Sequence, residues 1–61
     1  MNKIQEYRKK QNLRQADLAK KMNVSRTTVT KWESGKILPR SKLLPKLALV
    51  LKCNIDDLFC I

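Results

Sequence analysis

The chain has 61 residues, and its 14 Lys and Arg against five Asp and Glu give a net charge of +9 at pH 7. This length predicts one small domain, 1–61, and the charge favours a polyanion as its partner. No apolar run reaches the roughly 18 residues of a membrane span, and no signal-peptide pattern is present, so we expect a cytoplasmic protein without a membrane partner.

The basic residues are unevenly distributed along the chain. Residues 1–40 contain eleven Lys and Arg and three Asp and Glu, a charge of +8, whereas residues 41–61 carry only +1. One part of the folded domain should therefore be strongly electropositive. An ordinary basic surface without a nucleic-acid partner is the alternative that charge alone leaves open.

One Gly, two Pro and the lack of an alternating strand pattern predict an all-α domain of five short helices. The first helix is predicted at 3–10 and the second at 15–22. In the second helix Leu18, Ala19 and Met22 have the three- and four-residue spacing of a buried stripe.

A sharp turn should separate the second helix from the third. Asn23 lies where the turn needs a left-handed backbone conformation, which Asn tolerates better than most residues. Ser25 is a good N-cap for a third helix at 26–34, and Gly35 should end it.

The last third of the chain predicts two more helices. Ser41 should cap a fourth helix that runs to about residue 51, with Pro45 in its opening turn, where a missing backbone N–H costs least. A fifth helix should follow Asn54 as its cap. The apolar residues expected to face inward are Leu44, Leu47, Ala48 and Leu51 in the fourth helix and Ile55, Leu58 and Phe59 in the fifth.

Two short helices joined by a tight turn are typical of the helix-turn-helix motif. Three segments resemble the Xre-type family that includes the lambda and Cro repressors: Leu-Arg-Gln-Ala-Asp-Leu-Ala at 13–19, Val-Ser-Arg-Thr-Thr-Val at 24–29 and Lys-Trp-Glu-Ser-Gly-Lys at 31–36. The resemblance implies a lambda-repressor-like fold with its helix-turn-helix at about 15–34. It also implies a sequence-specific transcriptional regulator, which we expect to be a repressor that inserts its third helix in the major groove.

The resemblance assigns base reading to Ser25, Arg26, Thr27 and Lys31. Arg can donate to both O6 and N7 of guanine, Thr can bond a base or touch a thymine methyl, and Lys can donate to guanine. Three of the four residues 27–30 are Thr, which has a low helix propensity, and core packing does not require Thr on an exposed face. Their presence therefore favours a functional role over mere exposure. The orientation of Thr28 is left open.

The same resemblance implies phosphate contacts at the start of the second helix and around the end of the third: Arg14, Gln15, Thr30, Lys36 and Arg40. A helix N-terminus binds phosphate through its free N–H groups, and basic side chains add charge. Family members commonly have Ser, Thr or Asn as an N-cap where this chain has Arg14, so we interpret Arg14 as a phosphate ligand. Because the following loop varies in length across the family, Lys42 is an alternative to Arg40.

A third feature implied by the resemblance is an ion pair between Arg8 in the first helix and Glu33 near the end of the third. Glu33 would then support the structure and would not touch DNA. Two unrelated surface charges are the alternative, since most surface ion pairs contribute little.

One short helix reads only about four or five base pairs, so we expect a homodimer on a pseudo-palindromic operator. The predicted dimer surface is the apolar set Leu49, Leu58, Phe59, Cys60 and Ile61 at the nearly neutral end of the chain. Alternatively, Leu58 and Phe59 pack into their own domain and the last two residues fray.

Catalysis is not expected, because the chain has no His, no nucleophile with an evident base partner and no Gly-rich phosphate loop. Two cysteines without a histidine exclude a tetrahedral zinc site, so we expect no metal, no cofactor and no small-molecule ligand. A protein-interaction module that docks acidic partners and a basic membrane-surface peptide are the competing hypotheses.

Overall fold

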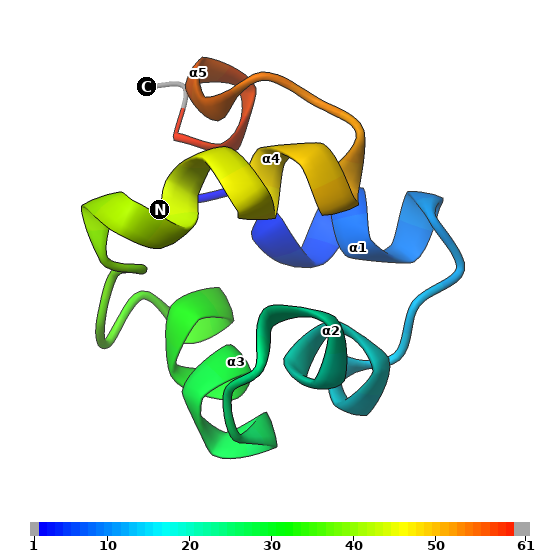
Figure 1. The fold of residues 1–61 in the computed structure, drawn as a ribbon, viewed down its shortest axis with the longest axis vertical. Coiled ribbons are helices and arrows are strands. Elements are labelled where there is room, and N and C mark those ends of the chain that lie inside the picture. Colours follow the sequence, from blue (N-terminus) through cyan, green and yellow to red (C-terminus); the bar gives the residue numbers. More distant parts are fainter. Residues whose placement is uncertain (1, 60–61) are drawn as a thin grey trace.

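The computed structural model describes residues 2–59, which form five α-helices, one 3₁₀ turn and no strand (Figure 1). This confirms the predicted all-α, five-helix fold. The elements in chain order are α1 (Ile4–Lys10), α2 (Gln15–Met22), α3 (Arg26–Ser34), η1 (Ser41–Leu43), α4 (Leu44–Leu51) and α5 (Ile55–Leu58).

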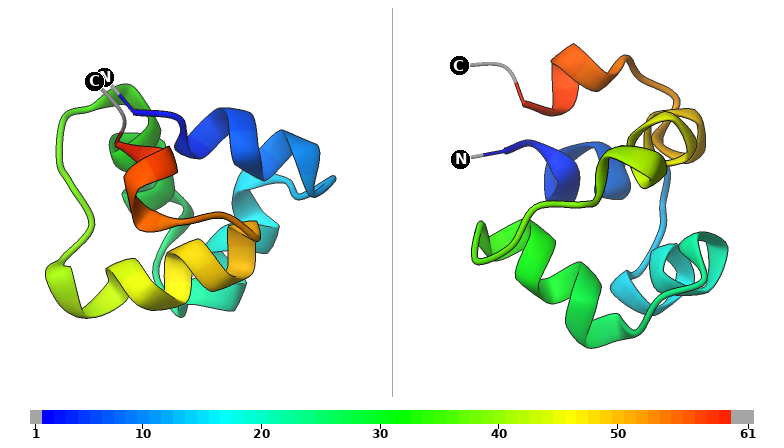
Figure 2. Two further views of the ribbon diagram at one scale, coloured as in Figure 1. Left: turned by 90° about the horizontal axis from the view of Figure 1, so that it is seen from above. Right: turned by 60° about the vertical axis from the view of Figure 1, so that its left-hand side comes forward.

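A single apolar core joins all five helices. Helices α2 and α3 lie at one end of the molecule and α5 at the other, with α1 and α4 between them (Figure 1). The first and last described segments lie side by side, where the Lys3 N–H donates to the Leu58 carbonyl at 2.8 Å (Figure 2). The core residues are Ile4, Leu18, Ala19, Met22, Val29, Trp32, Leu47, Leu51 and Leu58.

The turn between α2 and α3 forms as the local sequence predicts. Asn23 ends α2 with a φ of 57°, and Gly35 ends α3 with a φ of 82°. The Ser25 hydroxyl accepts the Thr28 backbone N–H at 3.2 Å and so caps α3. Local residue chemistry therefore sets both ends of α3.

The start of the fourth helix differs from the prediction. Ser41 begins the 3₁₀ turn η1 instead of capping α4. An α-helix capped by Ser41 would need a bond from the backbone N–H of Pro45 to the Ser41 carbonyl, and proline has no N–H. The Ser41 carbonyl therefore accepts from Leu44, one residue earlier, and α4 starts at Leu44. Leu43 and the predicted inward residue Leu44 are both half-buried, and Leu43 packs against the core.

The predicted dimer surface needs a correction at its centre. Leu58 is fully buried among the core residues, and Phe59 is half-buried against them. Leu58 joins the core because the tertiary fold brings α5 back to the N-terminal segment, where the Lys3 N–H donates to the Leu58 carbonyl. Leu49 is 78% exposed, and Cys60 and Ile61 lie outside the described residues.

The end of α4 predicts a stabilising substitution. Lys52 ends this helix with a φ of 55°, a left-handed conformation that strains any residue with a Cβ. Lys52→Gly should raise the free energy of unfolding by about 0.5–1 kcal/mol, measured by urea denaturation. Lys20→Gly, within α2, removes the same charge and should instead destabilise the domain by about 1 kcal/mol. Equal effects from both variants would contradict this account.

Candidate nucleic-acid interface

Helix α3 has one buried and one exposed face. Val29 and Trp32 are buried in the core, whereas Arg26, Thr27 and Lys31 are exposed along its first six residues. Thr27 and Lys31 are four residues apart, which places them on the same side of the helix. The predicted base-reading positions are thus exposed together.

Several hydroxyl groups near the start of α3 bond within the chain. The Ser25 hydroxyl lies 2.9 Å from the Thr28 hydroxyl, in addition to capping the helix. The Thr30 hydroxyl donates to the Arg26 carbonyl at 3.1 Å and to Gln15 Oε1 at 3.3 Å. Ser25 therefore serves as a cap, and Thr28 is oriented toward the turn.

Arg8 and Glu33 form a buried ion pair, with 2.6 Å between Arg8 Nε and Glu33 Oε2 and side chains only 8% and 5% exposed. Arg8 also donates to the Leu13 carbonyl at 2.7 Å. The other Glu33 oxygen accepts the Gln15 amide Nε2 at 3.0 Å. The carboxylate therefore ties together α1, α2 and α3, which fixes the angle between the two helices of the motif.

The start of α2 carries a second basic group. Arg14 is the N-cap residue, but its guanidinium contains only hydrogen-bond donors and cannot accept a backbone N–H of the helix. Only the other bond of a capping box therefore forms: the Arg14 backbone N–H donates to Asp17 Oδ2 at 2.9 Å. This bond and, secondly, the Arg14 guanidinium at 3.2 Å hold the pKa of Asp17 below its usual value. The Arg14 side chain is 85% exposed.

These groups surround a small hollow of about 280 Å³, lined by Arg8, Arg14, Gln15, Ala16 and Arg26. It lies where the N-terminus of α2 packs against α3, with the Arg26 side chain of α3 on its wall. Arginine side chains and helix N-termini both favour anions. An anion such as a phosphate would fit this position.

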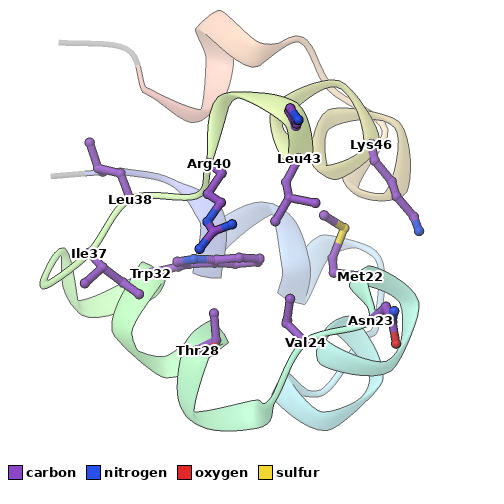
Figure 3. Close-up of a pocket in the computed structure, with 11 residues that line it drawn as sticks. Met22, Asn23, Val24, Thr28, Trp32, Ile37, Leu38, Arg40, Leu43 and Lys46 are labelled. Atoms are coloured by element: carbon purple, nitrogen blue, oxygen red, sulfur yellow. The ribbon is translucent and has the colours of Figure 1, made fainter.

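Beyond α3 the loop to η1 contributes Lys36 and Arg40, both exposed. Arg40 points toward the Trp32 ring across a hollow of about 640 Å³ between α3 and η1 (Figure 3). Lys42 lines the same hollow. The choice between Arg40 and Lys42 as the phosphate ligand stays a prediction.

Comparison with known proteins assigns this arrangement to a family. The helix-turn-helix family model matches residues 4–58, nearly the whole described chain. The chain belongs to the Xre/Cro-type helix-turn-helix family. It is therefore a DNA-binding regulator of transcription, and the predicted family is confirmed.

Three relatives of this helix-turn-helix protein are named as regulators of transcription. An HTH-type transcriptional regulator of Methanocaldococcus jannaschii is 47% identical over 95% of this chain and 88% of its own length. One from Archaeoglobus fulgidus is 42% identical over 93% of this chain and 80% of its own. The HTH-type transcriptional activator BcrR of Enterococcus faecalis is 41% identical over 92% of this chain but only 28% of its own length.

Two contacts of this helix-turn-helix domain escaped the sequence reasoning. The Asn2 amide donates to the Trp32 carbonyl at 2.8 Å, and its oxygen accepts the Ile4 N–H at 3.1 Å, which joins the N-terminal segment to α3. The second is the bond from Gln15 to Glu33. The Asn2–Trp32 and Gln15–Glu33 bonds have no local sequence signal, because each joins residues at least 18 positions apart. The Asn2–Ile4 bond is local, since it joins residues two positions apart.

Within residues 2–59, no three His, Cys, Asp or Glu side chains are grouped closely enough to hold a metal ion. None of the helices in that range is both long and apolar enough to cross a membrane.

Proposed function

We propose that the protein binds a specific duplex operator by inserting α3 into the major groove, with Arg26, Thr27 and Lys31 at the base edges. The observation that carries this proposal is the exposure of these three side chains on a helix whose opposite face is anchored in the core. A groove about 12 Å wide admits one helix, so the exposed face of α3 can approach the bases. Ser25, a fourth predicted base reader, acts in this proposal as the helix cap.

The phosphate contacts in this proposal come from both sides of α3. Arg14 and the free N–H groups of α2 would hold one phosphate, and Lys36 and Arg40 would hold others. The Gln15 amide already bonds Glu33 and accepts from Thr30, so Gln15 contributes its backbone N–H. The Thr30 hydroxyl bonds the Gln15 amide, so in this proposal Thr30 supports Gln15 and does not itself hold a phosphate.

Two copies would bind a pseudo-palindromic site as a homodimer. A domain of 25 × 23 × 20 Å allows two copies side by side with their α3 helices about 34 Å apart, one turn of DNA. The exposed Leu49, beside Pro45 and Ile55, replaces Leu58 as the centre of the proposed interface.

We propose repression as the outcome, because occupation of an operator is sufficient to block other proteins from the same DNA. BcrR is named an activator, but this chain spans 28% of that protein. That name bears on a much larger protein.

A selection from a random duplex pool tests the proposed function, followed by two matched single substitutions. Lys31→Ala should relax base preference at one position and cost about 1–3 kcal/mol on the preferred site. Lys36→Ala removes the same charge and should weaken the preferred site and its single-base variants equally. Binding that ignores sequence would refute the specific operator and favour a general polyanion binder. If Lys36→Ala altered base preference and Lys31→Ala did not, the proposed docking would be wrong.

A further inference from the structure

We infer that the operator half-site contains two guanines, one read by Arg26 and one by Lys31. The inference rests on the proposed function and concerns which bases the interface can recognise. It follows from the hydrogen-bonding groups that α3 leaves free.

The segment 25–31 contains only hydroxyl, basic and apolar side chains: Ser, Arg, Thr, Thr, Val, Thr and Lys. Recognition of adenine by two bonds needs a side chain that both donates and accepts, as Asn and Gln do, and cytosine needs an acceptor such as Glu or Asp. Guanine presents two acceptors, O6 and N7, which match a side chain that only donates. Arg26 and Lys31 are the long polar side chains of this segment, and both only donate.

Gln15, the first residue of α2, is the side chain beside Arg26 that could otherwise read adenine. It lines the same hollow as Arg26. Its Nε2 donates to Glu33 at 3.0 Å and its Oε1 accepts from Thr30 at 3.3 Å, so each end of the amide already has one partner within the domain, which fixes its orientation. Glu33 is in turn held by Arg8 at 2.6 Å. The buried ion pair therefore keeps the amide away from the bases.

The remaining hydroxyl groups add little competing readout. Ser25 and Thr28 bond each other, whereas Thr27 is exposed and forms no side-chain hydrogen bond within residues 2–59. Its methyl group suits a thymine methyl. Arg26 and Lys31 are five residues apart, about 7.5 Å along the helix and about two base-pair steps, so both guanines fall within one half-site.

The test uses the full chain and the sites selected from the random pool. Every selected half-site should contain two guanines, and replacing either with 7-deazaguanine, which lacks the N7 acceptor, should weaken binding about 5-fold or more. 7-Deazaadenine at an adenine of the same site should change binding less than about twofold. Arg26→Gln should change the preferred base at one position from guanine to adenine. Arg40→Gln, with the same change of side chain in the loop, should keep guanine at both positions.

Half-sites without guanine, unchanged binding to 7-deazaguanine, or an Arg26→Gln variant that keeps guanine would each overturn the inference while the regulator still recognises an operator. A pool from which no common sequence emerges would instead overturn the proposed function, and the inference with it.

Discussion

Glu33→Ala should lower the free energy of unfolding by about 3–5 kcal/mol, because it leaves the Arg8 charge buried without its partner. The side chains of the pair are 8% and 5% exposed, so water cannot replace the lost carboxylate without opening the core. The same substitution removes the acceptor of the Gln15 amide. Urea denaturation followed by the fluorescence of the single tryptophan, Trp32, measures the loss.

Two further variants separate the buried ion pair from a simple change in charge. Glu6→Ala removes an exposed carboxylate from α1 and should change stability by less than about 0.5 kcal/mol. The double variant Arg8→Met, Glu33→Leu replaces the pair by apolar side chains and should recover most of the stability lost in Glu33→Ala. This comparison tests the account even if the single variant is largely unfolded. A loss below about 1 kcal/mol in Glu33→Ala would show that the pair is no more than a surface contact.

DNA affinity should fall about a thousandfold between 50 and 200 mM salt. Each copy offers three cations to the phosphates in the proposed complex, Arg14, Lys36 and Arg40, so a dimer would neutralise about six phosphates. The slope of log K against log salt would then be about −5. Titration of labelled operator at four or more salt concentrations measures this slope.

Substitutions distinguish the proposed contacts from the overall positive charge. Arg14→Ala should reduce the slope by about 2, one contact per copy, whereas Lys20→Ala, an exposed cation in the last turn of α2, should leave it unchanged. Leu49→Glu should give a monomer in sedimentation and a slope near −3. A wild-type protein that is monomeric both free and on DNA would exclude the dimer and its Leu49 interface.

The sequence alone determined the family and all of the helices except the start of α4. Helix α2 ends, and α3 begins and ends, where predicted because Asn23, Ser25 and Gly35 act through their own backbone and side-chain chemistry on the adjacent residues. The spacing of three short segments was sufficient to identify the helix-turn-helix family, since the motif is itself local. The exposed positions of α3 followed from helical periodicity.

The tertiary structure decided the long-range partners that no local pattern or family resemblance indicated. Periodicity predicts that Leu58 lies on the apolar face of its helix, but only the return of α5 to the N-terminal segment shows that this face is buried in its own domain. The capture of the Gln15 amide by Glu33 likewise depends on the angle at which α2 packs on α3, 18 residues along the chain. A local pattern specifies which face of a helix is buried, whereas the contacts on that face depend on how distant segments pack together.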